Sequence, residues 1–199
     1  MGCPSKSVAA SGSGAALIKT PDLAHAIVRA ARQGLEDWAG GQSIHSQGFK
    51  PSRIEFIHTL NHSRSGVPVV PRRLLPLSIK TRLGFDCVVV ERWVEHLLEA
   101  RPAAITLHGR TLQQMYRGAA DWSAIAEAAK LAHGTGTLML GNGDLNTLVD
   151  AIRRAAESKV QGVLVGRGTL GSPWFFREKE QARRAFSERD DLSTLPATA

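Results

Sequence analysis

From residue 77 onward one arrangement occurs four times: a short apolar run ends in polar residues and a helix follows. The predicted strands cover residues 77–81, 104–107, 137–141 and 162–166. Apolar residues at helical spacing predict the helices, over 88–100, 121–133, 145–158 and 173–185. Strands that alternate with helices form parallel βαβ units, in which both faces of the sheet are buried. The sequence therefore predicts an α/β protein built on a parallel sheet.

Polar side chains gather where these strands end. They are Lys80, Arg82, His108, Arg110, Asn142, Asp144 and Arg167. In a (β/α)₈ barrel the working groups lie at the carboxyl ends of the strands, so this set predicts a barrel-type active site. Helix capping is the alternative role for loop residues of this kind. Capping suits Asp144 well, but it suits Lys80, His108 and Arg167 poorly, because each comes directly after the apolar part of its strand.

The last two strand ends are rich in glycine, with Gly-Asn-Gly-Asp at 141–144 and Gly-Arg-Gly at 166–168. Glycine loops after the last two strands of a barrel, leading into helices, form the common phosphate site of this fold. Arg167 can bind such a phosphate through two hydrogen bonds. Lys80 can place a cation near the N1/O2 edge of a flavin, and His108 can donate a hydrogen bond to the same ring or to a substrate.

The first 40 residues read as a turn-rich segment over 2–17, followed by a helix over 21–38 with Thr20 as its N-cap. Cys3 lies in a Gly-Cys-Pro turn and is either an accessible reactive thiol or a small buried hydrophobe. Cys87 is predicted to be the latter. Residues 40–74 are mostly loop with a short helix over 51–62. They form either an exposed surface insertion or a basic contact with RNA phosphates through Lys50, Arg53, Arg64, Arg72 and Arg73.

Composition limits the remaining choices. The 199 residues carry a formal charge of +7, which suits a polyanionic partner such as nucleic acid. Two cysteines indicate no disulfide framework, and no apolar run is long enough to predict a membrane span or a signal peptide. These features predict a cytoplasmic protein with no membrane partner. No Walker motif, metal-ligand spacing or Gly-x-Ser-x-Gly motif favours ATP, zinc or serine-hydrolase chemistry.

Five motifs in this order resemble the tRNA-dihydrouridine synthase family. They are Gly2-Cys3-Pro4-Ser5-Lys6 with Val8 and the run 12–17, Ile79-Lys80-Thr81-Arg82-Leu83-Gly84, His108-Gly109-Arg110-Thr111 with Gln114, Tyr116 and Ala120-Asp121-Trp122, Asn142-Gly143-Asp144, and Val165-Gly166-Arg167-Gly168. No single motif is decisive, but their order and spacing extend from residue 2 to about residue 180.

The resemblance implies a TIM barrel that holds FMN, is reduced by NADPH and reduces the C5–C6 double bond of a uridine in tRNA. It implies that Cys3 is the general acid that protonates C5. The implied FMN contacts are Lys80, His108, Asn142, Gly143, Asp144, Gly166 and Arg167. The implied contacts with RNA are Arg110, Tyr116 and Arg117.

The chain departs from the family pattern at both ends. The Gly-Cys-Pro loop of the family follows the fourth barrel strand, so residues 1–185 correspond to the last four βα units, a half-barrel with an insertion at 40–74. The family's C-terminal helical domain is missing, and 186–199 is expected to be a disordered tail. A half-barrel is expected to bind FMN weakly. Two alternatives remain: a truncated, non-catalytic half-barrel that binds RNA or a partner half, and another FMN barrel oxidoreductase of the dihydroorotate dehydrogenase type.

Overall fold

The computed structural model describes residues 1–63, 72–172 and 174–175. The chain divides into two compact units, which are described separately. One comprises Met1–Ala26 together with the chain from Ser78 onward, and the other comprises Ile27–Leu77. The predicted insertion at 40–74 lies inside the second unit.

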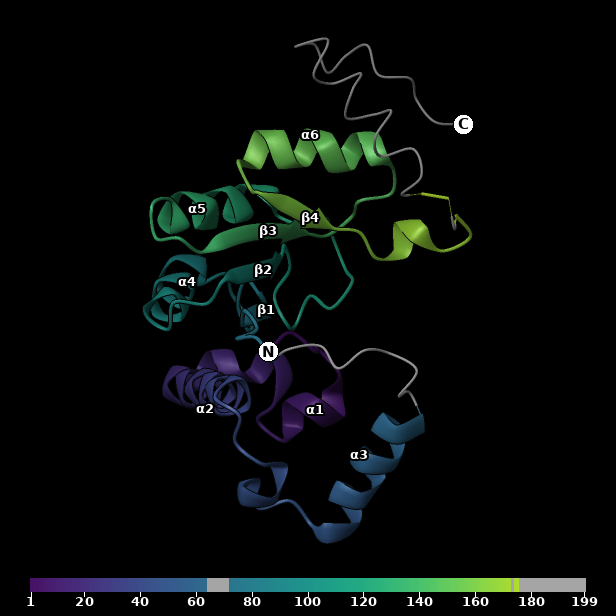
Figure 1. Ribbon diagram of the computed structural model, residues 1–199. Helices are drawn as coiled ribbons and strands as arrows, with labels where there is room; N and C mark the ends of the chain where they lie inside the picture. Colours follow the sequence, from purple (N-terminus) through teal and green to yellow (C-terminus); the bar gives the residue numbers. More distant parts are fainter. Residues whose placement is uncertain (64–71, 173, 176–199) are drawn as a thin grey trace. The chain divides into compact units, whose positions relative to one another are not determined.

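The first unit is built on a parallel four-stranded sheet with the strand order β1-β2-β3-β4 (Figure 1). The strands are β1 (Ser78–Arg82), β2 (Ala104–His108), β3 (Leu138–Asn142) and β4 (Gly162–Leu164). Their register places Arg82, His108, Asn142 and Leu164 in one row at the carboxyl ends. The predicted parallel α/β sheet is therefore confirmed, and β4 is shorter than expected.

Three helices connect successive strands: α4 (Val90–Glu99), α5 (Trp122–Ala132) and α6 (Leu148–Ser158). Crossovers between parallel strands are right-handed, so a sheet in sequential order carries its helices on one face, with α5 packed against both α4 and α6 (Figure 1). Helix α4 buries Val90, Trp93, Val94 and Leu97, a stripe at helical spacing. The centre of the core contains Ile105, Ile125 and Met139, all fully buried.

Helix α6 begins three residues later than predicted. The Thr147 hydroxyl accepts a hydrogen bond from the Asp150 backbone N–H at 3.0 Å, so Thr147 is the N-cap. The capping role considered for Asp144 is therefore wrong for this helix. The residues predicted to point inward, Leu148, Val149, Ile152 and Ala155, are only half-buried, while Ala151 and Ser158 are buried. The helix predicted over 173–185 and the tail lie outside the described residues.

The N-terminal segment contains two elements that were not predicted, α1 (Lys6–Ala10) and the 3₁₀ helix η1 (Gly14–Lys19). The buried residues of η1 are Ala15, Ala16, Leu17 and Ile18. The predicted helix follows as α2 (Pro21–Ala39), and the Ala24 N–H donates to the Thr20 carbonyl at 3.1 Å. The prediction of a buried Cys87 is wrong, because this thiol is exposed in the turn before α4.

The second unit contains the rest of α2, a 3₁₀ helix η2 (Ile44–Gln47) and α3 (Pro51–Ser63). The short helix predicted at 51–62 is thus confirmed. The Arg72 guanidinium donates to the carbonyls of Trp38 and Gln42 at 3.2 and 3.1 Å, which ties the end of α2 to the returning chain. Of the basic residues considered for RNA contact, Arg64 lies outside the described residues.

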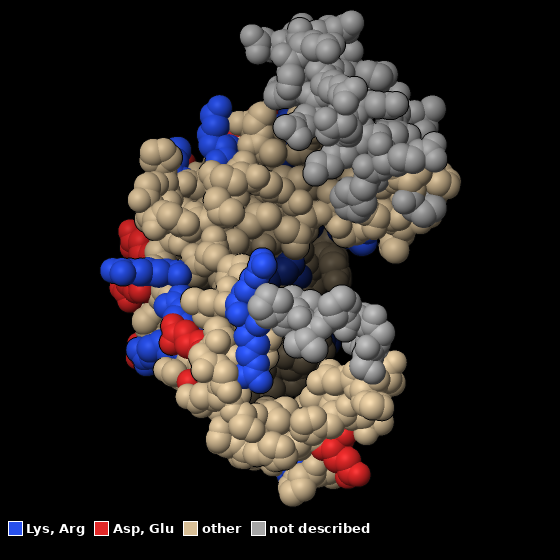
Figure 2. All heavy atoms as spheres, viewed as in Figure 1, with Lys and Arg blue, Asp and Glu red and all other residues tan. Residues whose placement is uncertain are grey.

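Acidic and basic side chains lie side by side on the helical flank of the first unit (Figure 2). Pairs such as Lys130–Glu127 and Arg154–Glu157 are exposed ion pairs one helical turn apart, which contribute little to stability. Within the described part of the chain, no helix combines the length and apolar character that a membrane span needs.

Candidate active site

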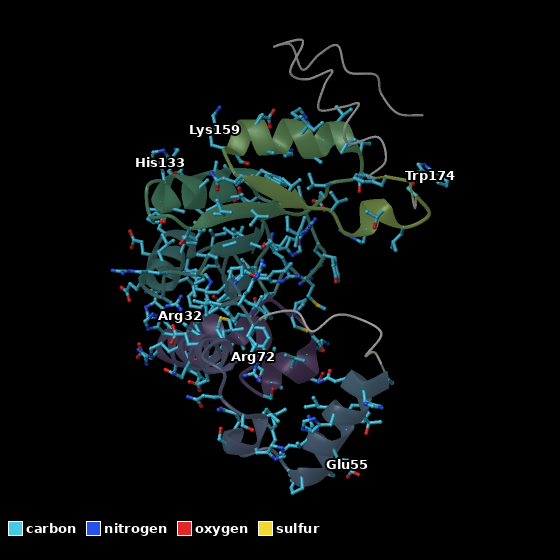
Figure 3. All side chains as sticks on the ribbon, viewed as in Figure 1. Arg32, Glu55, Arg72, His133, Lys159 and Trp174 are labelled. Atoms are coloured by element: carbon cyan, nitrogen blue, oxygen red, sulfur yellow. The ribbon has the colours of Figure 1, made fainter. Side chains whose placement is uncertain are left out.

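A cavity of about 280 Å³ lies at the carboxyl ends of the strands. Its walls come from the N-terminal segment, β1, β2, β3 and the loops after β3 and β4. The lining residues are Gly2, Pro4, Lys80, Arg82, His108, Tyr116, Asn142, Gly143, Asp144, Leu145, Asn146, Leu164, Gly166, Arg167 and Gly168. The opposite end of the sheet, where His133 and Lys159 lie before β3 and β4, is separate from it (Figure 3).

Asn142 joins three strands through its side chain. Its amide oxygen accepts a hydrogen bond from the Lys80 ammonium at 3.2 Å, and its amide NH₂ donates to the Leu164 carbonyl at 2.8 Å. These bonds fix the amide orientation and direct the ammonium toward the middle of the sheet end. Burial, and then the neighbouring Arg82 cation, lowers the pKa of Lys80. The site thus holds a cation on β1 at a defined position.

His108 ends β2 and is 8% exposed. Burial, followed by the cations Arg82, Lys80 and Arg110, lowers its pKa to about 4. The imidazole is therefore neutral at pH 7. Gly143 packs against the ring edge: a Cβ at this glycine would lie 3.2 Å from the His108 Cδ2 atom and 2.6 Å from the Ala120 Cβ atom. The glycine in the predicted loop motif is thus required for close packing on the histidine.

The resemblance implied that Arg110 contacts RNA. In the structure this residue is instead buried. It is 2% exposed, and its guanidinium donates to Asp144 Oδ2 at 2.7 Å and to the Gly118 carbonyl. A buried guanidinium is stable only when its charge and its N–H groups have partners. Here the partners lie in the loops after β2 and β3, which we call the loop cluster. The side chain holds the loop after β2 against the loop after β3.

Asp144 serves the same loop cluster. Its carboxylate accepts hydrogen bonds from Arg110 and from the Ala120 backbone N–H, each at 2.7 Å, and lies 3.4 Å from the Arg167 guanidinium. Burial alone would raise the pKa of Asp144, but the bonds from Arg110 and Ala120 lower it overall. The carboxylate is ionised at neutral pH and bridges two arginines.

The loop after β4 approaches the loop after β3 at Gly168. A Cβ there would clash with the Leu145 carbonyl and would lie 3.1 Å from the Asn146 Cα atom, so only glycine fits. Arg167 beside it is 62% exposed in its side chain, and its guanidinium lies 5.1 Å from the centre of the Tyr116 ring. Gly168 therefore closes the two loops against each other, whereas Gly166 has no atom within 4 Å of its Cβ position and leaves open space beside the exposed Arg167 guanidinium.

The Gly-Cys-Pro turn lies beside the cavity. Gly2 and Pro4 line the wall, whereas Cys3 is exposed and does not contribute to the lining. The buried Arg82 side chain donates to the Gly2 carbonyl at 3.1 Å and to the Thr111 and Met115 carbonyls at 2.9 and 3.1 Å. This arginine therefore ties the cysteine turn to the loop after β2.

Gly14 supports the same turn from the other side. Its φ of 62° lies in the left-handed region, and a Cβ would lie 2.6 Å from the Cys3 carbonyl oxygen. The Ala15 N–H donates to that carbonyl at 3.0 Å. The sequence showed a glycine-rich run here but not its role. In the structure Gly14 is the glycine that packs against Cys3.

The two remaining predicted residues, Tyr116 and Arg117, are exposed. Tyr116 is 59% exposed and forms the cavity rim with Arg167, while Arg117 lies outside the lining and donates to the Gln113 carbonyl at 3.1 Å. The structure thus brings Lys80, His108, Asn142, Gly143, Asp144, Gly166 and Arg167 together around one cavity. It adds Arg82 and Gly168, which the list of expected contacts lacked.

Comparison with known proteins agrees with this geometry. A family model described as dihydrouridine synthase matches residues 1–37 and 62–196. The chain is 31% identical to a probable tRNA-dihydrouridine synthase 2 of Bacillus subtilis over 98% of this chain and 49% of that protein. It is 40% identical to a probable tRNA-dihydrouridine synthase of Aquifex aeolicus over 55% of this chain and 34% of that protein.

A probable tRNA-dihydrouridine synthase of Rhodobacter capsulatus is 32% identical over 87% of this chain and 42% of that protein. The chain therefore spans between a third and a half of the length of these curated relatives. The family model leaves residues 38–61 unmatched, a stretch that contains η2 and most of α3. The strand-end residues and the Gly-Cys-Pro turn all fall inside the matched ranges, and this chain belongs to the dihydrouridine synthase family.

Proposed function

We propose that this chain is the cofactor-binding part of a tRNA-dihydrouridine synthase, which reduces the C5–C6 double bond of a uridine in tRNA. The observation that carries the proposal is the single cavity at the strand ends, where a fixed cation, a neutral histidine and two glycine-containing loops line one space. Family membership and the similarity to a probable tRNA-dihydrouridine synthase 2 support the same activity.

FMN is the proposed cofactor, with NADPH as its reductant; when bound, the flavin supplies the hydride. Gly166 and Arg167 are proposed to hold its phosphate, since the space beside Gly166 is open, the Arg167 guanidinium is exposed, and both residues line the cavity. Lys80 places its ammonium at the electron-accepting edge of the ring, and Asn142 holds Lys80 there at 3.2 Å. His108 and Gly143 form the neighbouring wall.

Cys3 is the proposed general acid. It holds a proton on its Sγ atom and delivers it to C5 of the uracil ring. Arg82 and Gly14 position its turn, through the 3.1 Å bond to the Gly2 carbonyl and the close approach to the Cys3 carbonyl. The exposure of Cys3 leaves its Sγ atom accessible to an incoming nucleotide.

Tyr116 and Arg117 are the proposed RNA contacts. Both are exposed on the loop after β2, one at the cavity rim and one beyond it, where an aromatic face and a guanidinium suit a base and a phosphate. Arg110 is reassigned to positioning, because its guanidinium is used inside the loop cluster. The proposed location of the protein is the cytoplasm, where tRNA is present.

The test is reduction of uridine in unmodified tRNA by a protein that contains this chain, in the presence of FMN and NADPH, with dihydrouridine measured by mass spectrometry. Cys3→Ala is expected to lower the rate at least about 100-fold, the usual contribution of a general acid. Cys87→Ala is the matched control, because this exposed thiol lies outside the cavity lining. Turnover of a small carbonyl substrate, with none of tRNA, would contradict the proposal.

A further inference from the structure

Arg110 contacts His108 in addition to the carboxylate and carbonyls that hold it. Its NH1 atom lies 3.4 Å from the His108 Nε2 atom, while NH2 is bonded to Asp144 and to the Gly118 carbonyl. Nε lies 3.4 Å from the Arg117 carbonyl and donates to it. Arg110 is 2% exposed and its guanidinium has partners on several sides, so it cannot swing away from the imidazole without breaking a partly buried ion pair.

The direction of the contact between Arg110 and His108 follows from chemistry alone. A guanidinium carries five N–H donors and no acceptor, so it can only donate. The His108 Nε2 atom must therefore offer a lone pair, and the ring proton must lie on Nδ1. An imidazolium, or a neutral ring protonated on Nε2, would point an N–H group at the N–H groups of a cation.

We propose that Arg110 is a positioning residue that holds His108 as the neutral, Nδ1-protonated tautomer, so that the ring presents one N–H donor to the cavity. Gly143 packs against the Cδ2 and Nε2 edge of the ring, at 3.2 and 3.5 Å from a Cβ position, so that edge is occupied by protein. The complementary ligand group is a hydrogen-bond acceptor, such as a carbonyl oxygen or an unprotonated ring nitrogen.

The charges around the imidazole act in the same direction. The groups that face it are Lys80 and Arg82 from β1, Arg110 from the loop after β2 and Asp144 from the loop after β3. Three of the four are cations, and together with burial they disfavour a second proton on the ring. Asp144 is ion-paired with Arg110, so its charge serves mainly to hold the guanidinium in place.

One part of this inference rests on the proposed function: the identity of the ligand that accepts the His108 hydrogen bond, which would be the flavin or the uracil. The state of His108 in the protein without ligand does not depend on that activity. Failure of the inference and failure of the proposed function are therefore distinguishable by measurements on the 199-residue chain alone.

The test is NMR of the chain labelled with ¹⁵N-histidine, with the His108 signals assigned by their loss in His108→Gln. We expect a non-protonated shift at Nε2 and a protonated shift at Nδ1 at pH 7, and no titration until the pH approaches 4. A protonated Nε2, an equal mixture of tautomers, or titration near the ordinary value of 6.5 would each overturn the proposal.

Variants separate positioning from general packing. Arg110→Met is expected to mix the two tautomers and to raise the His108 pKa, because the donor and one neighbouring cation are lost. Arg110→Lys keeps a donor and is expected to restore part of the Nδ1-protonated state. Arg117→Met is the matched control, since this exposed side chain lies on the same loop and donates to the Gln113 carbonyl. Unchanged His108 signals in Arg110→Met would contradict the inference, and if this variant fails to fold the measurement on the unaltered chain still decides.

Discussion

Two buried arginines hold the loops around the cavity in place, and their positions in the sequence do not predict this role. Arg82 and Arg110 both lie at strand ends in the sequence; in the structure Arg82 lines the cavity, whereas Arg110 lies behind His108 and contacts its ring. The length of an arginine side chain then determines which backbone groups the guanidinium can bond. The Arg82 guanidinium reaches carbonyls on the loop after β2, and the Arg110 guanidinium bonds carbonyls of its own loop and the Asp144 carboxylate of the loop after β3. Sequence spacing indicates which strand end a side chain belongs to, but it does not give the distance to a carbonyl on another loop.

His108 makes stability depend on pH. Its pKa is about 4 in the folded chain and about 6.5 when unfolded, so the unfolded chain binds the extra proton over that range. Stability is fully present above pH 6.5 and falls as the pH drops toward 4, by up to about 3 kcal/mol. His108→Gln is expected to flatten this acid-side loss, measured by urea unfolding at a series of pH values. His133→Gln, at an exposed loop position, is the control for the substitution itself.

Gly168 is expected to tolerate no side chain. Gly168→Ala places a methyl group against the Leu145 carbonyl and the Asn146 backbone, so the two loops must separate. The expected cost is about 1–3 kcal/mol of unfolding free energy, as for other overpacked positions. Urea denaturation measures it. Gly34→Ala in α2 is the control, because no atom lies within 4 Å of that Cβ position and alanine favours a helix. Equal stability of Gly168→Ala and the unaltered chain would contradict this account.

Among the elements, the four strands were predictable because each contains apolar residues that lead directly into polar ones. The first residues of the helices were harder to predict from the sequence. Helix α6 begins where Thr147 caps it, and the sequence offered Asp144 as an equally good candidate. Helix α1 has five residues and η1 consists largely of small residues, so neither shows the periodicity from which helices are predicted. Their formation depends on packing around the Cys3 turn.

Helix α5 depends on its cap. The Asp121 carboxylate accepts hydrogen bonds from the Ala124 N–H at 2.9 Å and from the Ser123 hydroxyl at 2.6 Å, and the Asp121 N–H donates to the Gly109 carbonyl. Asp121→Ala is expected to lower the unfolding free energy by about 1 kcal/mol. Asp121→Asn retains a capping oxygen and should recover most of that loss. Thermal or urea unfolding of both variants provides the comparison, and an equal loss in both would argue against capping.

Helix α3 lies in the stretch that the family model leaves unmatched, and it presents a groove lined by Lys50, Ser52, Arg53, Phe56 and Ile57. Two cations beside an exposed aromatic ring favour the RNA-contact interpretation over a passive insertion. The double variant Lys50→Ala and Arg53→Ala is expected to weaken tRNA binding and to reduce the salt dependence by about two counterions. Glu55→Gln, on the same helix, is the control (Figure 3). An unchanged salt slope would favour the passive insertion.

At the scale of the whole molecule, the α/β class and the placement of the cavity at the strand ends followed from the alternation of strands and helices. The division of the chain into two compact units at Ile27 and Leu77 could not be predicted in this way. Helix α2 crosses the first of these boundaries with no interruption of its helical sequence pattern. Sequence periodicity marks the ends of elements, whereas a boundary inside a helix is set by contacts that only the folded chain reveals.

The 199-residue chain on its own is expected to bind FMN weakly. Its cavity of about 280 Å³ lies at or below the small end of ligand pockets, so little of a flavin ring system would be removed from water. Flavin absorbance after gel filtration with added FMN measures this. Stoichiometric flavin that stays with the protein through the column would contradict the expectation.

Trp122 connects the helical layer with the cavity. Its indole N–H donates to the Gly143 carbonyl at 3.0 Å, and its six-membered ring lies against Gly141 at the end of β3. Gly143 in turn packs on His108, so the indole lies one glycine away from the imidazole. An indole with a buried N–H bond emits light that depends on that bond. Trp122 is one of four tryptophans in the sequence, so its emission becomes an optical reporter of the cavity, with no attached dye, once the other three are replaced.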